Sequence, residues 1–328
     1  QYHDVWVIAE QRYGEIKPVT FELLGTARRL ASARGGQVWC VMLGHNITRY
    51  ADDCFHRQAD VVLAVDDPEL THFVDDTYAN IIVDLINKYR PEIVLCGATS
   101  RGRALLPRVA VQVNAGLTAD CTGLEIEPET GNLLQTRPAF GGNIMATIKC
   151  MNHRPQMATV RPRVMSEPEL DKNRTGKLIS EPLPESMVSR RLHILQTFKD
   201  DEDTTSIADA HFIVAGGRGV QGPRGFDVLK EFAHLVGGAV GASRAAVDAG
   251  WIEYAHQVGQ TGQTVQPRVY IACGVSGQIQ HLVGMQSAQT IIAINRDANA
   301  PIMKIPDYAI VGDLFDVLPA MADELKRL

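Results

Sequence analysis

The sequence predicts an α/β protein made of two domains, and three observations support this prediction. Short apolar runs alternate with segments of helical periodicity, the pattern of repeated strand–helix units. The chain has 328 residues, which is long for a single hydrophobic core and an ordinary length for two domains. The 28 glycines are unevenly placed, with 13 in residues 1–205 and 15 in residues 206–328. The two parts of the chain therefore differ in construction.

A charged segment separates the two parts. Residues 199–205 read Lys-Asp-Asp-Glu-Asp-Thr-Thr, a run that cannot fill a hydrophobic core and is typical of a linker. We therefore expect an N-terminal domain of residues 1–204 and a C-terminal domain of residues 205–328.

The N-terminal elements follow one another at the spacing of a parallel sheet with helices on both faces. The pattern predicts strands at 4–9, 37–43, 61–65 and 93–97, and helices at 19–33, 47–55, 72–89 and 105–113. The pattern changes from Thr118, where strands 124–126 and 133–135 flank a turn and strands 143–149 and 157–160 follow. This predicts a Rossmann-like α/β domain with added antiparallel strands.

The C-terminal part returns to strand–helix alternation. Strands are predicted at 211–215, 269–273, 290–294 and 308–311, and helices at 226–236 and from 314 to about 325. This order predicts a second α/β domain with a parallel sheet.

Composition excludes several classes of protein. The net charge is −6 and no Lys/Arg-rich arm is present, which argues against a nucleic-acid footprint. No apolar run reaches the roughly 18 residues of a membrane span, and the first one, residues 5–9, is too short for a signal peptide. The six cysteines are widely spaced, so we predict no disulfide framework, no metal site and a reducing compartment; Cys40 and Cys96 are expected to be buried.

A glycine motif points to a nucleotide ligand. Residues 217–222, Gly-Arg-Gly-Val-Gln-Gly, fit G-x-G-x-x-G between a predicted strand and a predicted helix. Such glycines let the backbone approach a phosphate at the helix N-terminus. The acidic residue that would bind a ribose is not evident, since Asp248 lies too far along the chain. An ordinary glycine-rich turn is the alternative.

Two further segments carry candidate binding groups. Ser243 is placed to cap a helix, and Arg244 would then lie in its first turn, where a cation opposes the helix dipole and suggests a separate electrostatic role. The alternative is a surface arginine paired with Asp248 four residues later. Residues 257–263, Gln-Val-Gly-Gln-Thr-Gly-Gln, form either a polar loop that wraps a ligand or a plain surface turn.

A histidine and an asparagine complete the candidate site. His281 follows a second strand and glycine turn, in the first turn of a predicted helix, and Asn295 ends a strand, at the ligand-facing edge of a parallel sheet. His211, His234 and His256 are isolated and are interpreted as structural or surface residues. No serine–histidine–acid arrangement accompanies these groups, so no catalytic residue is assigned. These candidate residues are better suited to holding a large cofactor than to hydrolysing a substrate.

The C-terminal third resembles the α subunit of electron transfer flavoproteins. The resemblance rests on Gly-Gly-Arg-Gly at 216–219, Ser-Arg-Ala-Ala-Val-Asp at 243–248, Gln-Val-Gly-Gln-Thr-Gly at 257–262, Val-Ser-Gly-Gln-Ile-Gln-His at 275–281, Ala-Ile-Asn at 293–295, Ala-Pro-Ile at 300–302 and Asp-Tyr at 307–308. The N-terminal part agrees more weakly, through segments 97–99, 107–110 and 116–121. The resemblance covers essentially the whole chain.

The resemblance implies a C-terminal FAD-binding domain and a β-subunit partner that carries AMP or a second FAD. Such a heterodimer passes single electrons between a dehydrogenase, here an acyl-CoA dehydrogenase, and another redox partner, and is an electron carrier rather than an enzyme by itself. The residues implied to contact FAD are Arg218, Ser243, Arg244, Val258, Gly259, Gln260, Thr261, Ser276, Gly277, Gln278, Ile279, Gln280, His281, Asn295, Asp307 and Tyr308.

Three of these residues have implied roles at the flavin ring. In the family, the residue matching Thr261 hydrogen-bonds flavin N5, the one matching His281 lies near the N1/C2-carbonyl edge, and the one matching Arg244 lies against the isoalloxazine. Positive charge and donors at that edge would stabilise an anionic semiquinone. Gln278 stands where alanine is common and Ala309 where glycine is usual; neither change removes a polar contact.

The opening segments 10–14 and 21–25 resemble the branch of anaerobic bacteria found beside acyl-CoA dehydrogenases. Members of that branch often bifurcate electrons from NADH to a ferredoxin and an enoyl-CoA, so a cytoplasmic bacterial protein is expected. Two alternatives stay open at this point: an NAD(P)-dependent dehydrogenase, supported by the glycine motif, and a nucleotide-binding module without redox activity.

Overall fold

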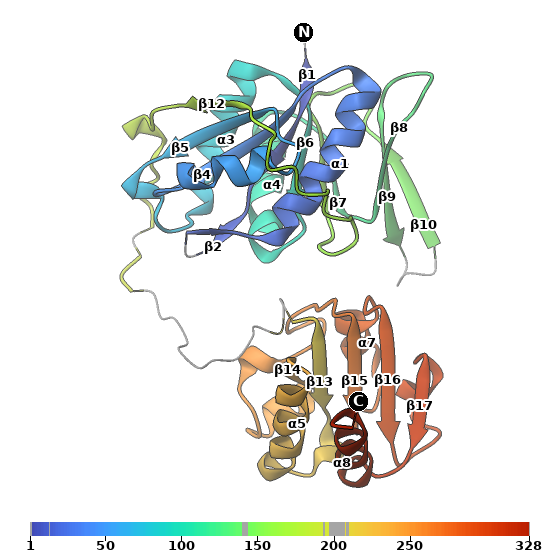
Figure 1. The fold of residues 1–328 in the computed structure, drawn as a ribbon. Helices are drawn as coiled ribbons and strands as arrows, with labels where there is room; N and C mark the ends of the chain where they lie inside the picture. Colours follow the sequence, from blue (N-terminus) through green and yellow to red (C-terminus); the bar gives the residue numbers. More distant parts are fainter. Residues whose placement is uncertain are drawn as a thin grey trace. The chain divides into compact units, whose positions relative to one another are not determined.

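The computed structural model describes residues 2–12, 14–139, 144–192, 194–196, 207 and 210–327. The chain forms two compact units, Gln1–Phe198 and Lys199–Leu328, and each is described here by itself (Figure 1). The expected domain boundary after residue 204 lies outside the described residues.

The N-terminal unit is built on a parallel sheet of seven strands in the order β12-β5-β4-β1-β6-β11-β7 (Figure 1). All of its neighbouring strands are parallel. The strands are β1 (His3–Ile8), β4 (Val38–Gly44), β5 (Val61–Asp66), β6 (Pro91–Gly97), β7 (Leu117–Cys121), β11 (Gln156–Val160) and β12 (Lys177–Ser180).

Helices cover both faces of this sheet, as the strand–helix alternation predicts. One face packs against α1 (Pro18–Arg34) and α2 (Ala51–Phe55), and the other against α3 (Asp75–Tyr89) and α4 (Ser100–Gln112). Short 3-10 turns lie at η1 (Thr48–Tyr50), η2 (Pro68–Leu70) and η4 (Glu185–Met187). The central strands are therefore apolar on both faces, which explains their continuous hydrophobic runs.

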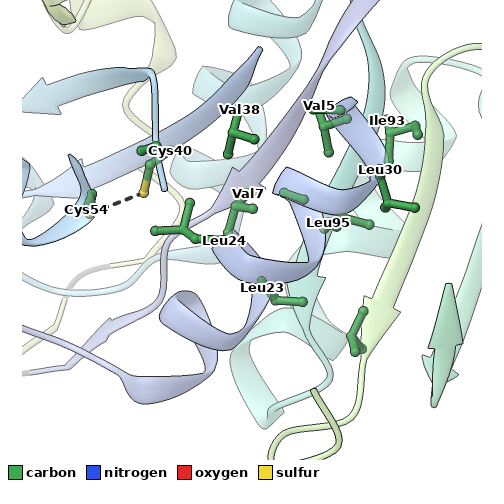
Figure 2. Close-up of a cluster of buried hydrophobic side chains, with 14 of the residues drawn as sticks. Val5, Val7, Leu23, Leu24, Leu30, Val38, Cys40, Cys54, Ile93 and Leu95 are labelled. Atoms are coloured by element: carbon green, nitrogen blue, oxygen red, sulfur yellow. Dashed lines mark hydrogen bonds between the residues drawn. The ribbon is translucent and has the colours of Figure 1, made fainter. Parts of the chain in front are cut away.

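Figure 2 shows the core between α1 and the sheet. Leu23, Leu24 and Leu30 from α1 lie over Val5 and Val7 of β1. The predicted burial of two cysteines is confirmed: Cys40 lies in this core, Cys96 lies in the core of the opposite face, and all six cysteines are free thiols.

The antiparallel additions are only partly as predicted. Strands β8 (Gly123–Ile126), β9 (Leu133–Ala139) and β10 (Ile144–Lys149) form the expected antiparallel sheet, and β2 (Gln11–Arg12) pairs with β3 (Glu15–Ile16) in a small ribbon that was not predicted. The strand predicted at 157–160 is present as β11, but its expected place among the antiparallel additions was wrong, because β11 is a parallel strand between β6 and β7. Every residue of β11 is buried, but so short a run does not show its direction in the sequence.

The C-terminal unit contains a five-stranded parallel sheet in the order β14-β13-β15-β16-β17. Its strands are β13 (Phe212–Gly216), β14 (Ala239–Ala242), β15 (Val269–Cys273), β16 (Thr290–Asn295) and β17 (Tyr308–Val311). Its helices are η5 (Arg218–Val220), α5 (Pro223–Leu235), α6 (Arg244–Asp248), η6 (Tyr254–His256), α7 (Ile279–Met285), η7 (Pro301–Lys304) and α8 (Leu314–Leu325).

The connections of this sheet create a place for a ligand. Helices α5 and α8 pack on one face, and α7 packs on the other (Figure 1). The chain therefore leaves the neighbouring strands β13 and β15 toward opposite faces. In open parallel sheets such a switch point leaves a crevice at the carboxyl ends of the strands, where cofactors bind.

Two findings concern other kinds of site. Among the described residues, no helix combines the length and apolar character that a membrane crossing requires. Within the same part of the chain, no group of three or more His, Cys, Asp or Glu side chains could hold a metal ion.

Candidate functional site

A pocket of about 630 Å³ lies at the carboxyl ends of the C-terminal strands. The loops that follow β13, β14, β15, β16 and β17 all contribute to its walls. This volume is within the usual range for sites that hold cofactors and other small ligands.

Most of the residues implied by the resemblance come together in this pocket. Those that line it are Arg218, Ser243, Arg244, Val258, Gly259, Gln260, Thr261, Ser276, Gln278, Gln280, His281 and Asn295. They come from several loops that are distant in sequence, so the fold alone brings them together.

Four of the implied residues do not line the pocket. Tyr308 pairs with Ile292 near the amino end of β16, and Asp307 accepts a hydrogen bond from the Ile291 N–H at 2.8 Å, so both lie at the opposite end of the strands. Ile279 begins α7 and has 59% of its surface exposed. Gly277 is a turn residue with φ +83° beside the Ile302 backbone.

The pocket also contains residues that the sequence interpretation missed. Arg296 and Asp313 both line it and form an ion pair with each other. Asp313 also caps α8, because its side chain accepts a hydrogen bond from the Phe315 N–H at 3.1 Å. It lies two residues after the end of β17, so the strand-end argument that selected Asn295 would have selected Asp313 as well.

Two glycines of the glycine motif have a packing role in the structure. A Cβ atom on Gly217 would lie 2.4 Å from the Gly274 carbonyl oxygen, and one on Gly219 would lie 2.7 Å from the Gly274 Cα. These glycines let the loops after β13 and β15 pack against each other. Gly222 and Pro223, at the start of α5, do not line the 630 Å³ pocket. Arg218, Gly219 and Gln221 of the motif do line it, and Gly222 and Pro223 line a second pocket of about 590 Å³, so the phosphate-binding role of the motif stays a prediction.

Arg244 fits both interpretations of its segment, because it pairs with Asp248 and also lines the pocket beside Ser243. Ser243 occupies the N-cap position of α6 as predicted, but its Oγ is buried and forms no hydrogen bond. The Nε of Arg244 lies 3.2 Å from Asp248 Oδ2, and both side chains are exposed at the pocket. Such an exposed pair contributes little to stability, which leaves the guanidinium available to a ligand.

The loop after β14 is held firmly rather than being a plain surface turn. The buried Gln257 donates from Nε2 to Thr261 Oγ1 at 3.0 Å, and Tyr254 donates to the Thr261 carbonyl at 2.5 Å. Gly259 has φ +143°, and a Cβ there would lie 2.8 Å from the Gln280 carbonyl. Since Gln257 occupies the Thr261 oxygen as an acceptor, the Thr261 hydroxyl proton is left for a ligand.

His281 is a buried, neutral side chain at the pocket. Only 7% of its surface is exposed, and burial lowers its pKa from 6.5 to about 4, with the Val258 carbonyl acting in the opposite direction. Its Nε2 lies 2.9 Å from the Tyr270 hydroxyl, whereas its Nδ1 forms no hydrogen bond. At neutral pH it offers a hydrogen-bonding group rather than a positive charge.

The charged groups of the pocket are nearly balanced. Arginines at 218, 244 and 296 face aspartates at 248, 297 and 313. Two arginines are paired, whereas Arg218 has no acidic partner among the described residues. Buried polar atoms without partners at Ser243 and His281 add unused hydrogen-bonding capacity. Fold and pocket together define an α/β protein with a pocket of cofactor size at the carboxyl edge of its C-terminal sheet.

Comparison with known proteins identifies the family. The electron transfer flavoprotein domain matches residues 5–186, and the electron transfer flavoprotein FAD-binding domain matches residues 206–286. The chain is 51% identical to the electron transfer flavoprotein subunit alpha of Thermoanaerobacterium thermosaccharolyticum, over 100% of this chain and 99% of the relative. This chain belongs to the electron transfer flavoprotein α-subunit family, and the two alternative classes are not supported.

Two further relatives carry more specific names. The chain is 40% identical to the acryloyl-CoA reductase electron transfer subunit beta of Anaerotignum propionicum, over 99% of this chain and 96% of the relative. It is 42% identical to lactate dehydrogenase (NAD(+),ferredoxin) subunit LctC of Acetobacterium woodii, over 98% of this chain and 76% of the relative.

Proposed function

We propose that this chain is the FAD-binding subunit of a heterodimeric electron transfer flavoprotein. In this proposal it passes single electrons between a dehydrogenase and a second redox partner. The observation that carries the proposal is the pocket itself, in which polar loops, three arginines and two buried polar atoms without partners converge. Such unpaired groups are costly unless a ligand satisfies them.

The residues present fit a large dinucleotide cofactor. The arginines at 218, 244 and 296 can neutralise phosphate charge, and Ser243 and Asn295 supply hydrogen-bonding groups beside them. The Thr261 hydroxyl and His281 offer further donors or acceptors to a polar ring edge. When bound, FAD supplies a ring system that takes up and releases electrons one at a time.

Within this assignment Arg244 is the group that supplies positive charge near the flavin. His281 is neutral at physiological pH, so it contributes a dipole, whereas the Arg244 guanidinium contributes a full charge that Asp248 partly offsets. Preorganised charge of this kind favours electron uptake over the oxidised state.

The Arg244→Ala substitution tests this role. We expect the potential for the first electron to fall by about 60 mV, the shift for a tenfold change in a one-electron equilibrium. Asp248→Asn is the matched control and should shift the potential upward. An anaerobic redox titration of the flavin-loaded protein measures both; unchanged potentials in both variants would remove Arg244 and Asp248 from the site.

FAD binding itself is tested by reconstitution. The full chain, purified with its β subunit and stripped of flavin, should take up FAD and regain the visible flavin spectrum. A Ser243→Ala/His281→Phe double variant should bind FAD at least about tenfold more weakly, because two hydrogen bonds are lost. Failure of the parent protein to bind FAD would refute the proposed function.

The partners are proposed from the family and from the names of the relatives. We infer a β subunit that carries AMP or a second FAD, and an acyl-CoA dehydrogenase as redox partner, in the cytoplasm of a bacterium. The two relatives named for acryloyl-CoA reductase and for a ferredoxin-linked lactate dehydrogenase make electron bifurcation from NADH the specific form to test. NADH oxidation that requires both a ferredoxin and an enoyl-CoA would support it, and oxidation with either one alone would contradict it.

A further inference from the structure

Behind the pocket wall, a buried tyrosine contacts the buried histidine. Tyr270 lies on β15 and is completely buried, and its hydroxyl oxygen is 2.9 Å from His281 Nε2 on α7. The two rings are 6.1 Å apart between centroids and inclined by 59°. Tyr270 does not line the pocket, whereas His281 does.

Counting protons decides which group donates. A tyrosine hydroxyl carries one proton, and a neutral imidazole carries one N–H and one bare nitrogen. Among the described residues, no other hydrogen bond involves the Tyr270 hydroxyl. If Nε2 carried the imidazole proton, the hydroxyl proton would have no acceptor in a buried site, at a cost of about 1–3 kcal/mol.

The opposite arrangement satisfies both groups. When Tyr270 donates to Nε2, the imidazole proton lies on Nδ1, the nitrogen that forms no hydrogen bond within the protein. Burial keeps the ring neutral above about pH 4, so only one nitrogen carries a proton.

We propose that Tyr270 is a positioning residue that fixes the orientation of the His281 ring at the pocket wall and its tautomer, with the proton on Nδ1. The tautomer follows from the protein alone. The identity of the ligand as a flavin rests on the proposed function. A fixed tautomer fixes the direction of the ring dipole at the pocket wall, which favours one charge state of the ligand without introducing a positive charge that would change with pH.

The tautomer can be measured without any cofactor. In the full chain with flavin removed and histidine rings labelled with ¹⁵N, NMR distinguishes a protonated from a bare ring nitrogen, and His281→Gln identifies the signals. We expect a protonated Nδ1 and a bare Nε2. Tyr270→Phe, which keeps the ring, should produce a mixture of tautomers. Tyr254→Phe, which removes the hydroxyl that donates to the Thr261 carbonyl, is the control and should leave His281 unchanged.

The flavin-loaded protein supplies a second readout. Tyr270→Phe should lower the first one-electron potential by a fraction of the 59 mV that corresponds to a tenfold change. A protonated Nε2 in the parent protein would overturn the proposal, even if Tyr270→Phe did not fold. A protonated Nδ1 without FAD binding would refute the proposed function alone. FAD binding with potentials unchanged by Tyr270→Phe would refute the positioning role.

Discussion

At the scale of single residues, the pocket depends on buried side chains that hold other pocket side chains in place. Gln257 is 3% exposed and orients Thr261 through a 3.0 Å hydrogen bond to its hydroxyl oxygen. Tyr270 orients His281 in the same way, through the 2.9 Å hydrogen bond between its hydroxyl and His281 Nε2. Polar groups held from behind in this way are preorganised, so less conformational entropy is lost when they bind.

Replacing Gln257 should therefore weaken cofactor binding through Thr261. We expect Gln257→Leu to raise the Kd for FAD by about tenfold, since about 1 kcal/mol of hydrogen bonding and orientation is lost. Gln263→Leu is the matched control, because Gln263 donates to the Ala255 carbonyl on the exposed side of the same loop. Fluorescence titration measures both; equal losses would mean that Gln257 has no special role.

His281 also predicts a dependence of stability on pH. Its pKa is about 4 in the folded protein and 6.5 in the unfolded chain, so only the unfolded state gains a proton between these values. Its contribution is therefore fully present above pH 6.5 and is lost as the pH falls to 4, by about 3 kcal/mol. Urea unfolding at several pH values should show a smaller loss for His281→Gln. The exposed His234→Gln is the control and should behave like the parent protein.

At the scale of elements, the close packing of loops explains why several positions in the C-terminal unit are glycine. The sequence shows only that glycines are frequent there. Gly277 has φ +83°, and a Cβ there would lie 2.2 Å from the Ile302 backbone nitrogen. Gly237 also has a positive φ, +63°, but a Cβ there would meet nothing within 4 Å. A substitution at Gly237 therefore tests the cost of the left-handed backbone alone, whereas one at Gly277 also tests the cost of a steric clash.

We expect Gly237→Ala to cost about 1–2 kcal/mol, the usual cost of a left-handed conformation for a residue with a Cβ. Gly277→Ala should cost clearly more, because the Ile302 backbone must also move. Chemical denaturation of the full chain measures both. Equal losses would show that η7 moves aside at no cost.

Local patterns predict the bounds of several C-terminal elements well. The bounds of β15, β17 and α8 agree with the predicted 269–273, 308–311 and about 314–325. Strand β14 was missed because Ala-Val-Gly-Ala has little hydrophobic bulk, and α4 begins at Ser100, before the predicted 105, because its first turn is polar. The Thr99 side chain caps this helix, a signal that the interpretation did not use.

At the scale of the whole molecule, each unit has its own cores and its own buried titratable group. Glu22 on α1 has its pKa raised to about 7, chiefly by burial. Its effect on stability is opposite in sign to that of His281, because the folded state binds the proton first: its contribution is present below pH 4.5 and lost as the pH rises through 7. The two units should therefore respond oppositely to acid.

Thermal unfolding of the full chain should show this separation. Because the cores are distinct, we expect two transitions, and FAD should raise only the one that Gly277→Ala lowers. At a free FAD concentration of 100 times Kd, the gain should be about 2.7 kcal/mol. A single transition that shifts as a whole with FAD would contradict independent units.

The sequence by itself determined the two α/β folds, the family, and many residues of the pocket, because periodicity and short motifs are properties of neighbouring residues. Only the tertiary structure decided that Asp307 and Tyr308 lie at the far end of their strands, that Arg296 and Asp313 face the pocket, and that the motif glycines hold two loops together. It also decided that His281 is neutral and backed by Tyr270. These properties depend on burial and on contacts between strands distant in sequence, and no local pattern records them.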